Sequence, residues 1–255
     1  MEDFARTIAL HGIEMHYEDR GDPAAEPLLL LHGFFGTGAD WGLVFDLDAL
    51  AREFRVIVPD ARGHGRSTNP GGAFTVRQCA LDALALLDAL GVGRFRAAGV
   101  SLGAKTLLHV ATRAPSRVDA MVLVSATPYF PEQARPLMKA AAEAEHSAEE
   151  WAAMRARHAR GDDQIRALWR IAGTFATRHD DMNFTPPHLA TIAASTLVVS
   201  GDRDPFYPVE LAVALYRAIP RSRLWVMPGE GHGPIFGAAR EAFAATARSF
   251  LRERG

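Results

Sequence analysis

The sequence predicts an α/β protein whose mostly parallel central sheet is flanked by helices and carries an inserted helical cap. Short apolar runs without polar alternation, such as 28–31 and 56–58, are typical of strands covered on both faces. Amphipathic helical patterns alternate with these runs, which predicts right-handed crossovers onto a parallel sheet. The alternation stops between residues 128 and 188, where no convincing strand pattern occurs.

The predicted elements follow one another in a regular order. The chain opens with a hairpin of strands 7–10 and 14–17 around the turn at His11-Gly12. The spacing from Thr75 to Gln78 is that of a capping box and predicts the start of a helix. The remaining strands are expected at 28–31, 56–58, 95–100, 120–124, 196–200 and 223–227, and the remaining helices at 46–52, 76–90, 102–113, 209–218 and 239–251.

The break in the pattern divides the chain into two parts. Residues 1–127 and 189–255 are predicted to form the core, and residues 128–188 the cap. Within the cap, helices are expected at 133–145, 149–160 and 163–177. The second of these follows a capping-box spacing that begins at Ser147.

Composition excludes several functional classes. The chain has 255 residues, of which 48% are hydrophobic and 23% charged, as in folded globular proteins. A formal net charge of -2 without a run of five like charges predicts no nucleic-acid partner. No apolar stretch is long enough for a membrane span and no secretory signal is visible, so a cytoplasmic location is expected. The single cysteine, Cys79, can form no internal disulfide.

The pentapeptide Gly99-Val100-Ser101-Leu102-Gly103 has the form G-x-S-x-G and lies between a predicted strand and a predicted helix. Small residues on both sides of Ser101 allow a tight turn that exposes the hydroxyl. The helix N-terminus behind it favours developing negative charge. The motif therefore predicts Ser101 as a nucleophile.

A serine nucleophile needs a base to take its proton and a carboxylate to orient that base. His232 is the best candidate base, because it lies in a glycine-rich loop after the last predicted strand. Asp202 and Asp204 both follow the strand at 196–200 and precede His232, in the order nucleophile, acid, base. Asp204 is favoured, while Asp202 has the alternative role of capping the turn or pairing with Arg203.

Four segments together resemble the α/β-hydrolase fold superfamily, in its compact form with a helical cap inserted before the strand that leads to the acid. The resemblance covers nearly the whole chain and is carried by residues 32–35 (HGFF), 60–67 (DARGHGRS), the turn around Ser101, and 201–204 (GDRD) with Gly231-His232.

The resemblance also implies the roles of individual residues. The spacing G-x-x-D from Gly201 selects Asp204 as the acid of a Ser101, His232 and Asp204 triad. The backbone amides of Phe34 and Leu102 are implied as the oxyanion hole. The segment 60–67 and His32 are assigned structural roles, and neither a metal nor a cofactor is implied.

The resemblance, with its departures from individual subfamilies, implies a carboxylesterase for a small hydrophobic substrate. Relatives that cleave haloalkanes or epoxides carry aspartate at the nucleophile position, and Val100 and Ala104 differ from many carbon-carbon bond hydrolases. The alternatives are a carbon-carbon bond hydrolase, a lactonase, a cofactor-free lyase or perhydrolase, and a non-catalytic ligand receptor. Although most large apolar cap residues must pack the cap itself, the candidate substrate-binding residues are Phe35, Trp41, Phe130, Met138, Trp151, Trp169 and Phe206.

Overall fold

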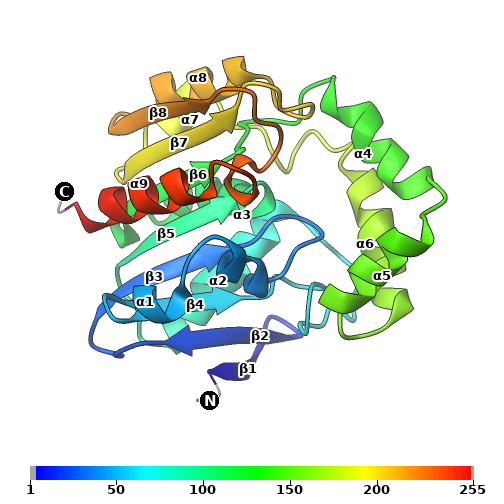
Figure 1. Ribbon diagram of the computed structural model, residues 1–255, viewed down its shortest axis with the longest axis horizontal. Helices are drawn as coiled ribbons and strands as arrows, with labels where there is room; N and C mark the ends of the chain where they lie inside the picture. Colours follow the sequence, from blue (N-terminus) through cyan, green and yellow to red (C-terminus); the bar gives the residue numbers. More distant parts are fainter. Residues whose placement is uncertain (1–3, 254–255) are drawn as a thin grey trace.

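The computed structural model describes residues 4–253, and its eight described strands form one sheet (Figure 1). The strand order is β1-β2-β4-β3-β5-β6-β7-β8. The first two strands form the predicted antiparallel hairpin, β2 also pairs antiparallel with β4, and the other pairs are parallel. The predicted α/β class is therefore confirmed. The strands are β1 (Ala5–Leu10), β2 (Ile13–Arg20), β3 (Glu26–Leu31), β4 (Phe54–Pro59), β5 (Phe95–Val100), β6 (Val118–Val124), β7 (Ser195–Gly201) and β8 (Ser222–Met227).

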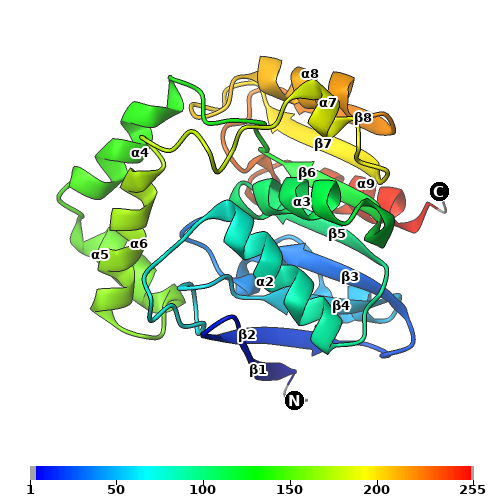
Figure 2. The same ribbon diagram turned by 180° about the vertical axis from the view of Figure 1, so that it is seen from behind.

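The apolar run of β3 is buried on both faces, as its sequence predicts. Leu29 and Leu31 point into one hydrophobic cluster and Leu28 and Leu30 into the other, because successive side chains of a strand alternate between faces. The views from the two sides show α1 and α9 over one face and α2 and α3 over the other (Figures 1 and 2). The core helices are α1 (Leu47–Ala51), α2 (Val76–Ala89), α3 (Leu102–Arg113), α8 (Val209–Ala218) and α9 (Arg240–Arg252).

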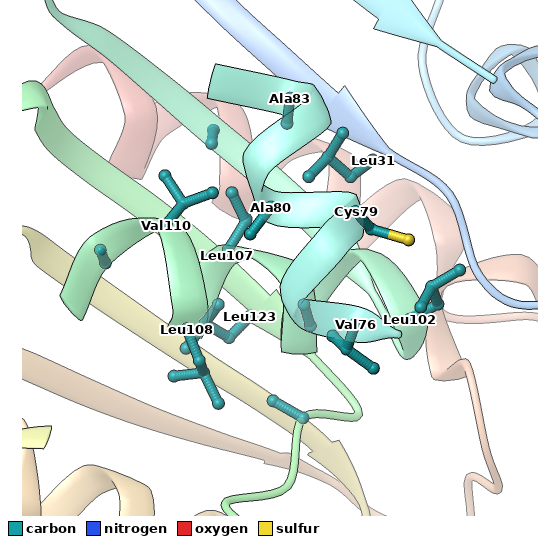
Figure 3. Close-up of a cluster of buried hydrophobic side chains, with 14 of the residues drawn as sticks. Leu31, Val76, Cys79, Ala80, Ala83, Leu102, Leu107, Leu108, Val110 and Leu123 are labelled. Atoms are coloured by element: carbon teal, nitrogen blue, oxygen red, sulfur yellow. The ribbon is translucent and has the colours of Figure 1, made fainter. Parts of the chain in front are cut away.

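Helices α2 and α3 pack on each other through small and aliphatic side chains, among which Cys79 is buried (Figure 3). At the start of α2, Thr75 Oγ1 accepts a hydrogen bond from the Gln78 amide at 2.9 Å. The Gln78 side chain donates to Asp82 at 3.0 Å, so only half of the predicted capping box forms. The amides of Val76 and Arg77 donate to the carboxylate of Asp181, which joins the predicted insertion to the core.

Three helices stand apart from the sheet between β6 and β7 (Figure 1). They are α4 (Ala134–Glu143), α5 (Ala148–Arg157) and α6 (Asp162–Thr174). Helix α5 ends before the predicted residue 160, because His158 takes an extended backbone conformation. Four short elements escaped prediction: the 3-10 helices η1 (Gly38–Leu43), η2 (Pro115–Arg117) and η3 (Pro234–Phe236), and helix α7 (Pro186–Leu189).

We propose that residues 128–188 form a cap and that residues 1–127 and 189–255 form the core. Residues 1–3 and 254–255 of the predicted core lie outside the described range. Helix α7 spans the proposed boundary at residue 188 and contacts α8 of the core. Within residues 4–253, no helix combines the length and apolarity that crossing a membrane requires.

Candidate active site

Ser101 lies in a sharp turn between β5 and α3. Its backbone angles are φ 50° and ψ -102°, a conformation that costs a non-glycine residue about 1–3 kcal/mol. The turn requires glycine two residues before and two residues after Ser101. A Cβ atom on Gly99 would lie 2.5 Å from the carbonyl carbon of Gly103, and one on Gly103 would collide with the carbonyl oxygen of Leu31. The G-x-S-x-G spacing therefore lets α3 pack directly behind the serine.

Three polar side chains from distant parts of the sequence meet at this turn. His232 Nε2 lies 2.9 Å from Ser101 Oγ, and His232 Nδ1 lies 2.7 Å from Asp204 Oδ2. A carboxylate only accepts hydrogen bonds, so the proton on the ring belongs at Nδ1 and Nε2 is free to accept the serine proton. The geometry is that of a nucleophile, a base and an orienting acid.

The Asp204 carboxylate is held by two further hydrogen bonds and its side chain is fully inaccessible to solvent. Its Oδ1 accepts the backbone amides of Phe206 at 2.8 Å and Tyr207 at 3.1 Å. Asp202 instead accepts the Gly229 amide at 2.6 Å and stabilises the loop that carries the histidine. The two neighbouring aspartates thus have separate tasks.

The loop after β3 forms a four-residue turn next to the serine. The Gly36 amide donates to the Gly33 carbonyl at 3.0 Å, and Phe35 has a left-handed backbone conformation with φ 65°. A Cβ atom built on Gly33 would lie 3.8 Å from Ser101 Cβ, so the turn is close to the nucleophile. Within residues 4–253, neither the Phe34 amide nor the Leu102 amide donates a hydrogen bond. In the described chain both amides are thus without a hydrogen-bond partner, as the predicted oxyanion hole requires.

His32 also stabilises this turn. Its Nε2 accepts the Ala61 amide at 2.9 Å, and its Nδ1 donates to the Gly33 carbonyl at 2.7 Å. This arrangement matches the structural role expected for His32. The segment 60–67 therefore supports the turn through a hydrogen bond rather than by contact with the serine.

A cavity of about 410 Å³ opens over Ser101 and His232. Its walls combine apolar side chains with one acidic and one basic residue, Asp40 and Arg157, whose carboxylate oxygen and Nε lie 3.6 Å apart. Leu43 and Phe236 line the cavity although 55% and 42% of their surfaces are exposed. The other side chains that line it are Phe34, Phe35, Val100 and Met154.

Several predicted substrate-binding residues occupy other places. Trp41 was wrongly assigned: it is 1% exposed and stacks on Phe45 in the core cluster next to α9. Trp169 stacks on His146 within the cap, with Trp151 against its edge. Four predicted residues do not line this cavity and pack instead within the described cap or between cap and core: Phe130, Met138, Trp151 and Trp169.

Two predicted residues do lie at the site. Phe35 lines the cavity, and the ring of Phe206 contacts that of His232 with centroids 4.9 Å apart. Sequence reasoning missed Leu43, Arg157 and Phe236. Each is the last residue of a helix, η1, α5 and η3 respectively, and a single residue at a helix end produces no periodic signal.

Three buried basic side chains lie near the site, and burial lowers the pKa of each. Burial lowers the pKa of Lys105 to about 7, although its Nζ donates to the Tyr207 hydroxyl at 2.8 Å. Burial also lowers the pKa of His158 to about 4 and that of His64 well below its usual value. Both histidines are therefore neutral at pH 7.

This burial predicts a loss of stability in mild acid. Below pH 6.5, the unfolded chain protonates His64 and His158 while the folded chain leaves them neutral. The free energy of unfolding should therefore fall as the pH drops from 6.5 to about 4, by up to roughly 1.4 kcal/mol per pH unit for His158, and His64 changes it in the same direction. Thermal unfolding measured across this range checks the slope. A melting temperature that stays constant down to pH 4.5 would contradict it.

Comparisons with known proteins agree with this architecture. The sequence profile described as the alpha/beta hydrolase family matches residues 28–246. The chain is 30% identical over 280 residues to 2-hydroxymuconate semialdehyde hydrolase of Pseudomonas sp. (strain CF600), covering 98% of this chain and 95% of that protein. It is 27% identical over 253 residues to pimeloyl-[acyl-carrier protein] methyl ester esterase of Nitrosomonas europaea, covering 87% and 93%.

A solved structure of a hydrolase from Pseudomonas aeruginosa PA01 superimposes with a TM-score of 0.78 at 27% identity, covering 98% of both chains. Another relative matches less than half of this chain. The chain is 36% identical over 111 residues to an acetyltransferase component of the acetoin cleaving system of Pseudomonas putida, and this match covers only 30% of that protein.

Proposed function

The chain belongs to the α/β hydrolase family, and from this membership we propose that it is a serine hydrolase that cleaves small hydrophobic carboxylic esters. The observation that carries the proposal is the continuous hydrogen-bonded series Ser101, His232 and Asp204, with distances of 2.9 and 2.7 Å. Such a series activates a hydroxyl that is otherwise a weak nucleophile. The esterase of Nitrosomonas europaea is a full-length relative whose name matches this reaction.

The proposed reaction has two halves. His232 takes the proton of Ser101 as Oγ attacks the ester carbonyl, and Asp204 stabilises the imidazolium that forms. The amides of Phe34 and Leu102 bind the oxyanion of the tetrahedral intermediate. His232 then gives its proton to the leaving alcohol, which produces an acyl-enzyme on Ser101. Water attacks the acyl group with His232 again as base, and His232 then returns the proton to Ser101 Oγ as the carboxylic acid leaves.

The cavity supports a hydrophobic acyl or alcohol group. Phe35, Leu43, Met154 and Phe236 line it around the serine. The reaction requires water as its second substrate and no cofactor. A cytoplasmic setting and a small-molecule substrate belong to the same proposal.

A carbon-carbon bond hydrolase is the second candidate, favoured by the match to 2-hydroxymuconate semialdehyde hydrolase along nearly the entire chain. The same three side chains serve both readings. Val100 and Ala104 remain the sequence features that weigh against this alternative.

Two measurements test the ester hydrolase. The first is hydrolysis of nitrophenyl esters of graded acyl length, in parallel with turnover of 2-hydroxymuconate semialdehyde. The second is covalent labelling by a fluorophosphonate, located by mass spectrometry. We expect ester turnover and a label on Ser101. Absence of labelling would overturn the activated serine, whereas turnover of the semialdehyde alone would favour the second candidate.

A further inference from the structure

The cap contacts the core loop 63–66 through residues 158–164, which run from the end of α5 into the first turn of α6. These residues are called the docking segment. Gln164 Nε2 donates to the carbonyl oxygens of Gly63 at 3.0 Å and Gly65 at 3.1 Å. The Ala159 amide also donates to the Gly65 carbonyl, at 3.1 Å. The docking segment therefore recognises the backbone of a loop that leads away from the carboxyl end of β4.

His158, the first residue of the docking segment, contacts a second core loop as well, the one that contains Phe35. It is 1% exposed and lies between two core loops. Its Nδ1 accepts the Gly65 amide at 3.0 Å, and its Nε2 lies 3.3 Å from the Phe35 carbonyl oxygen. A neutral ring that accepts at Nδ1 carries its proton on Nε2, so Nε2 donates to Phe35. The tautomer follows from these partners.

The Phe35 carbonyl belongs to the turn that presents the Phe34 amide. Phe35 has φ 65°, and a bulky non-glycine residue reaches this region only when its surroundings hold it there. His32 and the Gly36 amide both act on Gly33, at the opposite end of the turn. In the described chain, His158 donates a hydrogen bond to the carbonyl of the strained residue itself. Relaxation of Phe35 would redirect the preceding peptide units of the turn.

We propose that His158 is a positioning residue for the oxyanion hole: the docked cap holds the Phe35 carbonyl through His158 Nε2, and this contact aims the Phe34 amide at the reacting carbonyl. The inference rests on the proposed function, because it concerns the amide that binds the oxyanion in that reaction. According to this proposal, the oxyanion hole reaches its working geometry only when the cap is docked on the core.

Two substitutions separate the two contacts of the ring. In His158→Asn, the side-chain amide reaches the position of Nδ1 and retains the docking contact with Gly65. In His158→Gln, the longer side chain places an amide near the position of Nε2 and retains the contact with Phe35. We expect His158→Asn to lower kcat by about ten- to a hundredfold with KM changed less than about threefold, because an amide displaced by about 1 Å stabilises the transition state poorly. We expect His158→Gln to keep kcat within about threefold of the native enzyme.

Gln164→Ala provides the matched control. It removes two hydrogen bonds from the docking segment to the loop 63–66 and touches neither Phe35 nor the serine. We expect its melting temperature to fall while kcat stays within about twofold. Rates are referred to the number of sites that a fluorophosphonate labels, so that unfolded protein does not count as lost turnover.

The outcomes are distinct. If His158→Asn loses no more kcat than Gln164→Ala, or if His158→Gln loses as much as His158→Asn, the positioning role is overturned and His158 only docks the cap. If His158→Asn does not fold, His158→Ala takes its place: a kcat at least tenfold below that of Gln164→Ala supports the inference, and a kcat within twofold of that control overturns it. If the native enzyme neither hydrolyses esters nor takes the label, the proposed function fails and this inference fails with it.

Discussion

Replacing Ser101 by alanine is expected to lower kcat for a nitrophenyl ester by about a millionfold, the scale seen when a serine nucleophile is removed from a complete triad. Ser101 Oγ lies 2.9 Å from His232 Nε2, and alanine leaves that base without a group to activate. The free amides of Phe34 and Leu102 still stabilise an oxyanion, so about a thousandfold acceleration over water should survive. Initial rates at high enzyme concentration, referred to the amount of folded protein measured by circular dichroism, give the ratio.

The fold should tolerate this change, because alanine removes one oxygen and adds no atom in the turn. Ser200→Ala is a suitable control: it removes another buried hydroxyl, near the end of β7, which donates to the Gly201 carbonyl at 3.3 Å. We expect its kcat to remain near that of the native enzyme. If Ser101→Ala keeps even one hundredth of the native activity, the serine is not the nucleophile.

Asp204→Asn is expected to lower kcat by about ten-thousandfold without unfolding the protein. The asparagine oxygen can still accept the amides of Phe206 and Tyr207, so the local backbone is retained. Its NH₂ group would face His232 Nδ1, which now lies 2.7 Å from a carboxylate oxygen. A donor there favours the opposite tautomer, in which Nε2 carries the proton and cannot accept one from the serine.

Asp202→Asn is the matched comparison two residues away. Asp202 accepts only the Gly229 amide in the described chain, a bond that asparagine can also accept. We therefore expect a change in kcat of less than about threefold, with the pH-rate profile preserved. The reverse ranking of the two variants would assign the acid to Asp202.

The sequence predicts most of the sheet because its signals are local. The run Leu28 to Leu31 and the motif around Ser101 each specify a strand or a turn without reference to the rest of the chain. Because both aspartates follow the same strand, Asp204 is favoured on the alternative roles open to Asp202, and the family resemblance then selects it. Its position next to His232 could not come from periodicity.

The walls of the cavity could not be predicted in the same way. Trp41 has the size and position of a lining residue, yet the η1 helix turns it into the core, where it stacks on Phe45. Leu43, two residues later, lines the cavity instead. Which side chain faces a ligand depends on how separate elements pack, and a single sequence does not encode this as a pattern. The early end of α5 has the same origin, because the ring of His158 docks on Gly65.

The carboxylate of Asp181 sits on the first two amides of α2 and has a consequence for exchanging caps between relatives. A chimera that receives a foreign insertion keeps this core helix but loses its capping carboxylate. Two amide groups would then lack their partner, at a cost of about 1 kcal/mol or more for a lost cap. A transplanted cap must therefore bring an aspartate, asparagine or serine at the place where its chain returns, or the recipient scaffold begins the exchange with a weakened helix.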